Sequence, residues 1–140
     1  MSVMPAPTTR LAPGDPRRLR ELFSRTGSLA CEHAIPSVVV GLAGREGDLL
    51  VPELIGYIES ALRMEDAIFR MTRERAVLFV SDVDRARAEQ IVARLVRDFC
   101  ERFASVDQPA VELGYYEVRA GSREVSAKEV LPVVFGAERN

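Results

Sequence analysis

The apolar residues of the chain follow two alternating patterns, which predict strands and helices. Four segments are short, apolar and rich in β-branched or aromatic residues, as is typical of strands. They are residues 37–42, 66–71, 76–80 and 111–119. Elsewhere apolar positions recur every three or four residues, which indicates helices. These helices are expected over residues 16–30, from Leu50 to about Arg63, from a cap at residues 81–84 to Ala104 and, briefly, after Ser126.

The order of these elements predicts the fold class. Residues 76–80 are apolar at five successive positions, so we expect this strand in mid-sheet with both faces covered. A tight connection joins it to the strand before. The inner β-α-β-β-α-β order is that of a ferredoxin-like α+β fold, with antiparallel strands and helices on one face. An extra N-terminal helix and a further C-terminal strand or helix would be added to this core.

Local signals mark the ends of two helices, and a third helix has a distinct polar face. Asp15 before Pro16 predicts an N-cap followed by a proline at the first helical position. Ser126 and Glu129 have the spacing of a capping box, and Pro132 should limit the helix that they open. The polar face of the helix ending at Ala104 contains Arg, Glu and Gln, and we expect it to be solvated surface.

Length and composition predict one domain. With 140 residues, 47% hydrophobic and 29% charged, the chain can build one core. Residues 1–14 contain three prolines and no apolar period, which predicts a flexible leader before a single domain at residues 15–140. No apolar run approaches the ~18 residues of a membrane span. We therefore expect a cytoplasmic protein without a membrane anchor.

Charge and cysteine content exclude several function classes. The net charge of −2 argues against nucleic acid or an anionic membrane as partner. An RNA-binding module of the same strand order would also need aromatic-rich strands, which are missing. Cys31 and Cys100 lie far apart, and His33 is the single histidine, so neither a zinc site nor any other cofactor is expected.

A family resemblance appears at residues 63–80, R-M-E-D-A-I-F-R-M-T-R-E-R-A-V-L-F-V. This stretch and the helix after it resemble the centre of the GGDEF (diguanylate cyclase) family. There an R-x-x-D precedes a strand, a Gly-Gly-Asp-Glu-Phe hairpin follows, and an apolar strand and a helix come next. The register fits without gaps to about Leu95. The resemblance implies the nucleotide-cyclase form of the ferredoxin-like core.

The signature hairpin of that family is degenerate in this chain. The five signature positions are occupied by Thr72, Arg73, Glu74, Arg75 and Ala76, so only Glu74 stays acidic. Glycines there would let a nucleotide approach the backbone, and Thr72 and Arg73 would block it. The family's metal-binding Asp is replaced by Gly41 or Ala43. The resemblance therefore implies an inactive domain without a metal site, because phosphoryl transfer relies on metal ions held by carboxylates.

The R-x-x-D motif survives as Arg63 and Asp66. In many GGDEF proteins such a pair binds cyclic di-GMP, so the resemblance implies a cyclic di-GMP site that signals to a protein partner. An Arg fork suits phosphate or the guanine edge, and a carboxylate accepts from guanine N–H groups. Arg70, on the same face of the strand as Ile68, would add positive charge.

Two other interpretations stay open. Arg63 at a helix end and Asp66 just beyond it could form an ordinary ion pair without a ligand. The chain could also be an adaptor that works through a protein partner or as a homodimer. The surfaces for that role would be residues 17–30, the arginines of the hairpin tip and residues 128–135.

Overall fold

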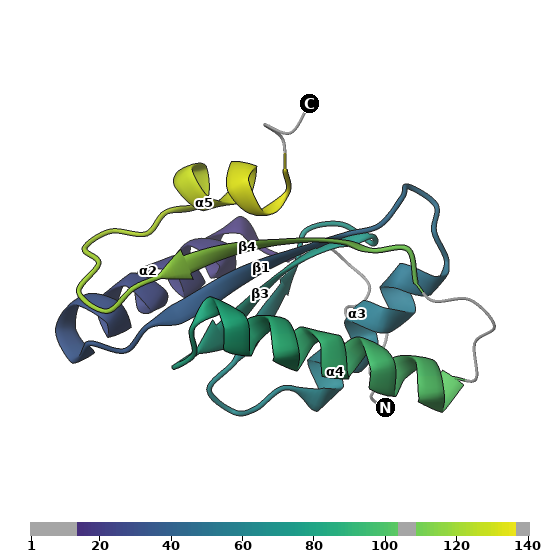
Figure 1. Ribbon diagram of the computed structural model, residues 1–140. Helices are drawn as coiled ribbons and strands as arrows, with labels where there is room; N and C mark the ends of the chain where they lie inside the picture. Colours follow the sequence, from purple (N-terminus) through teal and green to yellow (C-terminus); the bar gives the residue numbers. More distant parts are fainter. Residues whose placement is uncertain (1–13, 104–108, 137–140) are drawn as a thin grey trace, which may run out of the picture.

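The computed structural model describes residues 14–103 and 109–136, which form four helices and four strands (Figure 1). The helices are α2 (Pro16–His33), α3 (Leu50–Ala61), α4 (Arg85–Phe103) and α5 (Ala127–Val134). The strands are β1 (Ser37–Ala43), β2 (Ala67–Arg70), β3 (Arg75–Ser81) and β4 (Glu112–Val118). All four predicted strands are confirmed, with ends that differ by one residue at most. Residues 1–13 of the predicted leader and the predicted helix end at Ala104 lie outside the described residues.

The strands form one antiparallel sheet in the order β2-β3-β1-β4. This is the strand order of the predicted ferredoxin-like core, which is confirmed. The central strands are β1 and β3, and the five residues from Ala76 to Val80 are all buried. Mid-sheet burial was expected from their apolar run, because such a strand has no face to present to water.

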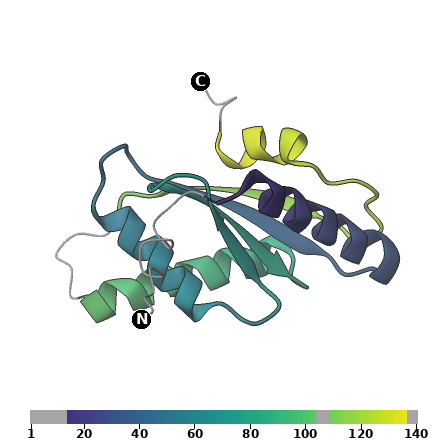
Figure 2. The ribbon, with the colours of Figure 1, turned by 180° about the vertical axis from the view of Figure 1, so that it is seen from behind.

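Helices cover both faces of the sheet (Figures 1 and 2). On one face α3 and α4 pack against Val38, Val40 and Leu42 of β1. On the other face α2 and α5 pack around Val39, because successive side chains of a strand point to opposite faces. The inner α3 and α4 lie on one face, as predicted. The extra N-terminal helix and the C-terminal addition, which is the helix α5, form the second layer.

The predicted N-cap of α2 is present. Asp15 accepts a hydrogen bond from the backbone N–H of Arg17 at 2.9 Å, and Pro16 begins the helix. The side-chain and backbone hydrogen bonds from Arg17 lower the pKa of Asp15. The helix ends where Ala34 adopts the left-handed conformation, with φ of 56°.

The predicted capping box of α5 is not formed. Ser126 is the N-cap residue but makes no side-chain hydrogen bond to the helix. Glu129 instead accepts a hydrogen bond from the Tyr116 hydroxyl of β4, at 2.9 Å. Pro132 lies inside the helix, which continues only to Val134. A contact with the sheet has replaced the local cap, which sequence spacing alone does not reveal.

Two glycines let the end of α5 come close to the sheet. Gly41 of β1 and Gly114 of β4 are paired directly across the two strands. A Cβ atom at either position would run into Val134, whose carbonyl oxygen lies 2.7 Å from the Cβ position of Gly41 and still closer to that of Gly114. Two larger residues would therefore hold α5 away from the sheet.

No helix within residues 14–103 and 109–136 combines the length and the apolar character needed to cross a lipid bilayer.

Replacing Gly114 by alanine should destabilise the protein, because the new methyl group overlaps the backbone of Val134. We expect Gly114→Ala to lower the free energy of unfolding by about 1–3 kcal/mol, the usual range for overpacking. Denaturant unfolding measures the change. The control is Gly56→Ala in α3, where the nearest atom is 3.6 Å from the new Cβ. That variant should gain about 0.5–1 kcal/mol from helix propensity. Equal stability of the two variants would contradict the packing described here.

Candidate ligand-binding site

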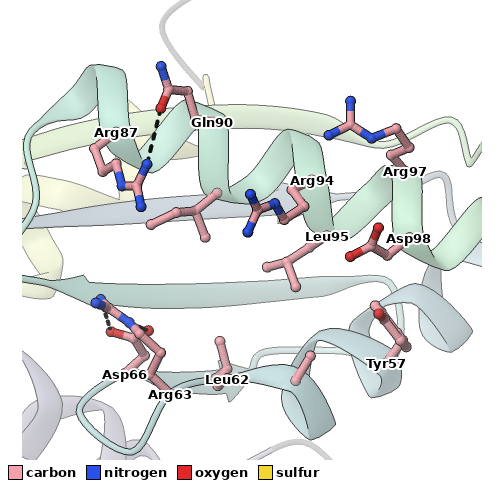
Figure 3. A pocket seen from close by; sticks show the side chains of 12 residues that line it. Tyr57, Leu62, Arg63, Asp66, Arg87, Gln90, Arg94, Leu95, Arg97 and Asp98 are labelled. Atoms are coloured by element: carbon pink, nitrogen blue, oxygen red, sulfur yellow. Dashed lines mark hydrogen bonds and ion pairs between the residues drawn. The ribbon is translucent and has the colours of Figure 1, made fainter.

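A cleft of about 440 Å³ opens between α3 and α4, on the face of the sheet away from α2 and α5 (Figure 3). The C-terminal end of α3 and the segment after it form one wall, and one face of α4 forms the other. Leu62, Ile91 and Leu95 supply apolar surface. Four arginines also line it: Arg63, Arg87, Arg94 and Arg97. The acidic lining residues are Asp66 and Asp98, so the cleft is locally positive although the chain carries a net charge of −2.

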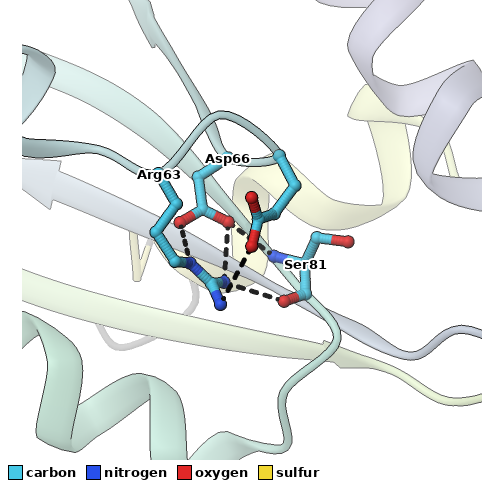
Figure 4. Close-up of polar contacts among 4 residues, drawn as sticks. Arg63, Asp66 and Ser81 are labelled. Carbon is cyan, nitrogen blue, oxygen red and sulfur yellow. Dashed lines mark hydrogen bonds and ion pairs between the residues drawn. The ribbon is translucent and has the colours of Figure 1, made fainter.

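The structure brings the two R-x-x-D residues into direct contact at the edge of this cleft (Figure 4). The Arg63 guanidinium binds the Asp66 carboxylate in a two-pronged pair, with Nε to Oδ2 at 2.7 Å and Nη2 to Oδ1 at 2.9 Å. Fork-shaped pairs of this kind are the strongest geometry that Arg and a carboxylate can form. The Asp66 hydrogen bond raises the pKa of Arg63.

The same pair also holds the end of β3. Arg63 donates from Nη2 to the Ser81 carbonyl at 2.9 Å, and Asp66 accepts from the Ser81 N–H at 3.0 Å. The side chain of Asp66 is only 4% exposed, whereas that of Arg63 is 43% exposed. The carboxylate is therefore engaged inside the protein, and the guanidinium is the part of the pair that faces the cleft.

One further acid lies beside Arg63. Glu65 is 3.3 Å from the remaining terminal nitrogen, Nη1, and half of its side chain is exposed. An exposed contact of this kind is screened by water and contributes little. An anion that binds Arg63 more tightly would displace the Glu65 carboxylate from Nη1.

The arginines of α4 were missed by the sequence analysis, which assigned them to solvated surface. Arg87, Arg94 and Arg97 are separated by seven and three residues, spacings that place side chains on one face of a helix. That periodicity was a usable signal. The spacing alone did not show that this face of α4 lies opposite Arg63. The orientation of α4 on the sheet is set by the burial of Val92, Leu95 and Phe99 in the core.

Arg70 lies elsewhere. It forms an ion pair with Glu59 of α3 at 3.1 Å, and its side chain is 11% exposed. It lines a second cleft together with Arg73, and it is absent from the lining of the Arg63 cleft. The structure therefore brings Arg63 and Asp66 together and places Arg70 apart from them.

The hairpin between β2 and β3 is tied to the loop after β1. Met71 donates to the Arg75 carbonyl at 2.9 Å and closes the turn, while Thr72 accepts from the Glu74 N–H at 3.3 Å. The Glu74 carboxylate accepts from the Gly47 N–H at 3.1 Å. The hairpin's one acidic side chain thus braces a neighbouring loop.

The other hairpin residues are divided between surface and core. Arg75 lies over the Phe135 ring at 5.1 Å, and Ala76 is fully buried in β3. Arg73 is exposed at the tip of the hairpin. Within residues 14–103 and 109–136, no three His, Cys, Asp or Glu side chains lie close enough together to hold a metal ion.

The surfaces considered for an adaptor are largely used inside the protein. The apolar residues of α2 pack on the sheet, with Leu22 and Phe23 buried. In α5, Val130 and Val134 are buried, and Val133 is 41% exposed. The apolar character of residues 128–135 is explained by packing against β1 and β4.

Neither a known family model nor a curated protein matches the sequence. Solved structures do match. The GGDEF domain of FimX from Pseudomonas aeruginosa is similar with a TM-score of 0.65 and 14% identity, over 86% of this chain and 83% of that one. PelD from P. aeruginosa PAO1, residue 158 to its C-terminus, is similar with a TM-score of 0.61 and 20% identity, over 77% of this chain and 40% of that one. Apo PelD 156–455 from strain PA14 gives a TM-score of 0.57 and 23% identity, over 76% and 40%.

Removing the Asp66 carboxylate should destabilise the domain. In Asp66→Ala the Ser81 N–H and two donors of Arg63 lose their acceptor, and we expect the free energy of unfolding to fall by about 2 kcal/mol. The matched control is Glu65→Ala, which removes the neighbouring exposed acid and should change stability by less than about 0.5 kcal/mol. Denaturant unfolding of both variants tests this. A loss as large in Glu65→Ala as in Asp66→Ala would refute the role given to Asp66.

Proposed function

Because the chain has the fold of a GGDEF domain, we propose that it is a catalytically inactive member of this fold that binds cyclic di-GMP at the Arg63 cleft and passes the signal to a protein partner in the cytoplasm. The observation that supports the proposal most directly is the convergence of Arg63 with the arginines of α4 on one cleft. A ligand with two phosphates and two planar bases suits such a cleft, since Arg pairs with phosphate and stacks on planar groups.

The size and composition of the cleft support a ligand of this class. Its volume of about 440 Å³ lies within the roughly 300–1,000 Å³ of small-molecule sites. Leu62, Ile91 and Leu95 supply apolar surface to the same cleft, and this surface would contact the faces of the bases. Charged groups at both walls would fix the phosphates.

Asp66 takes a positioning role in this proposal. Its oxygens already accept from Arg63 and Ser81, so it holds the guanidinium in a fixed orientation toward the cleft. Pre-orienting a donor lowers the entropy that is lost when the ligand binds. Contact of Asp66 with a guanine base would require part of this network to rearrange.

The proposed inactivity follows from the chemistry of the hairpin. Phosphoryl transfer needs carboxylates that hold divalent ions against the phosphates. Glu74 is the acidic residue left at the signature positions, and it is hydrogen-bonded to Gly47. Thr72 and Arg73 also stand where the family's glycines would admit the nucleotide.

The ligand proposal predicts binding that depends on α4. Titration calorimetry with cyclic di-GMP should give micromolar or tighter affinity, and Arg94→Ala should weaken it at least about tenfold, equivalent to about 1.4 kcal/mol. Arg94 is exposed on α4, so its removal should leave the fold intact. The control is Arg20→Ala on α2, across the sheet, which should bind as the unmodified protein does. Absence of heat with well-folded protein would refute the ligand proposal.

The inactivity proposal predicts no turnover of GTP. Purified protein incubated with GTP and Mg²⁺ should yield no cyclic dinucleotide, as measured by chromatography of the reaction mixture. The Glu74→Gln variant serves as the comparison. Product that forms with the unmodified protein and disappears in Glu74→Gln would show that the site is catalytic.

A further inference from the structure

The sheet has one long edge without a neighbour among the described residues. β4 pairs with β1 along one side only, over seven residues in continuous register. The opposite edge, β2, has four residues, and Gly14 donates to its Arg70 carbonyl at 2.9 Å. Long free edges are templates for further strand pairing, and proteins usually shorten, bulge or cover them. β4 is neither short nor bulged, and it lies in front of the other strands in Figure 1.

The register shows which backbone groups of β4 point outward. Gly44 donates to the Glu74 carbonyl at 2.8 Å, so even-numbered residues of β1 face β3 and odd-numbered residues face β4. Gly41 pairs with Gly114, and the even-numbered residues of β4 therefore face β1. The N–H and C=O groups of Leu113, Tyr115 and Glu117 point toward the free edge.

A groove runs beside this edge, between β4 and α4. It has a volume of about 570 Å³, and Val96, Cys100, Val111 and Leu113 supply its apolar surface. Arg97 and Glu101 of α4 also line it. Opposite charges thus stand one helical turn apart along a partly apolar groove.

We propose that β4 pairs antiparallel with β4 of a second copy of this chain about a two-fold axis at Tyr115, which makes one continuous eight-stranded sheet. In this register Leu113 lies opposite the partner's Glu117, and Val111 lies opposite the partner's Arg119. Residues directly opposite each other share a face of the sheet. The side chains of the partner's Glu117 and Arg119 therefore lie on the side of the groove beside α4. To enter it they exchange the contacts that they make within one chain, which are the hydrogen bond from the Arg85 N–H to Glu117 at 3.3 Å and the Arg119–Glu117 ion pair at 3.9 Å.

Charge complementarity selects a second copy as the occupant. Arg97, Glu101, Val111 and Leu113 all line the groove. The start of α4 lies at the end of β4, because the Arg85 N–H donates to Glu117 at 3.3 Å, so α4 and β4 run in opposite directions. Arg97 and then Glu101 therefore follow each other in the direction from Leu113 to Val111, and the incoming strand presents an acid and then a base in the same order. Four helical residues span ~6 Å, and two strand residues span ~6.6 Å, so the two patterns have the same spacing. Because the two-fold axis repeats every contact, each pair forms twice.

The test exchanges one of these charge pairs. Glu101 and Arg119 are exposed, and neither lines the Arg63 cleft. Sedimentation equilibrium of the unmodified protein in the micromolar range should give a dimer of the 15.5 kDa chain. Glu101→Arg alone and Arg119→Glu alone should each raise the dimer dissociation constant about tenfold, since like charges then meet twice. The double variant, in which the charges are exchanged, should restore dimerisation.

A cross-link tests the register independently. At the two-fold axis the two copies of residue 115 form a hydrogen-bonded pair, whose Cα atoms lie about 5.5 Å apart, within disulfide range. With Cys31 and Cys100 replaced by serine, Tyr115→Cys should form a disulfide dimer under mild oxidation, and the control Tyr116→Cys should not.

Either of two results would overturn the proposal. One is a monomer at all concentrations. The other is a dimer that neither single charge variant weakens and that Tyr115→Cys does not cross-link. The measurements are made without cyclic di-GMP, because Arg97 lines both the proposed ligand cleft and this groove. Their outcome therefore does not depend on whether the ligand proposal holds.

Discussion

The buried carboxylate of Asp66 is the interaction on which the geometry of the cleft depends. It binds Arg63 through both oxygens and takes the Ser81 N–H as a third donor. The segment between α3 and β2 is thereby joined to the end of β3, two strands and a hairpin later. A buried carboxylate needs this number of donors, because an uncompensated charge in a protein interior is strongly unfavourable. Asp66 in turn holds the Arg63 guanidinium on the wall of the cleft opposite α4.

The ion-pair interpretation and the ligand interpretation of R-x-x-D are therefore compatible. One partner of the pair is nearly fully buried and the other is almost half exposed. The buried Asp66 carboxylate stabilises the fold, and the exposed Arg63 guanidinium remains accessible to an anion. The three α4 arginines then give the cleft its positive character, which a single exposed ion pair would not provide.

The sequence predicted the fold well because strand burial and helix periodicity are local properties. The five apolar residues from Ala76 to Val80 can only lie in mid-sheet, and the Asp15–Pro16 start of α2 needs no information from elsewhere. Only part of the proposed cleft could be predicted from the sequence. Arg63 and Asp66 are three residues apart, so their contact follows from local geometry. Arg94 joins them only through the packing of α4, which depends on the whole core.

The capping box predicted for α5 was wrong because its residues also depend on contacts far along the chain. Ser126 and Glu129 have capping-box spacing, yet Glu129 binds the Tyr116 hydroxyl across the gap between α5 and β4. Burial and this hydrogen bond both raise the pKa of Tyr116. Arg70 shows a similar competition, since the nearby Glu59 of α3 engages its guanidinium away from the Arg63 cleft. A tertiary partner outweighed the local pattern at each position.

The packing of α5 on Gly41 and Gly114 restricts which side chains the centre of the sheet can accept. Gly41 is one of the two positions at which the GGDEF resemblance places a metal-binding aspartate, and a Cβ there would stand 2.7 Å from the Val134 carbonyl oxygen. An aspartate at Gly41 would have to displace the C-terminal helix before it could hold a cation. Placing an aspartate at this position would thus require a change of architecture as well as a change of residue.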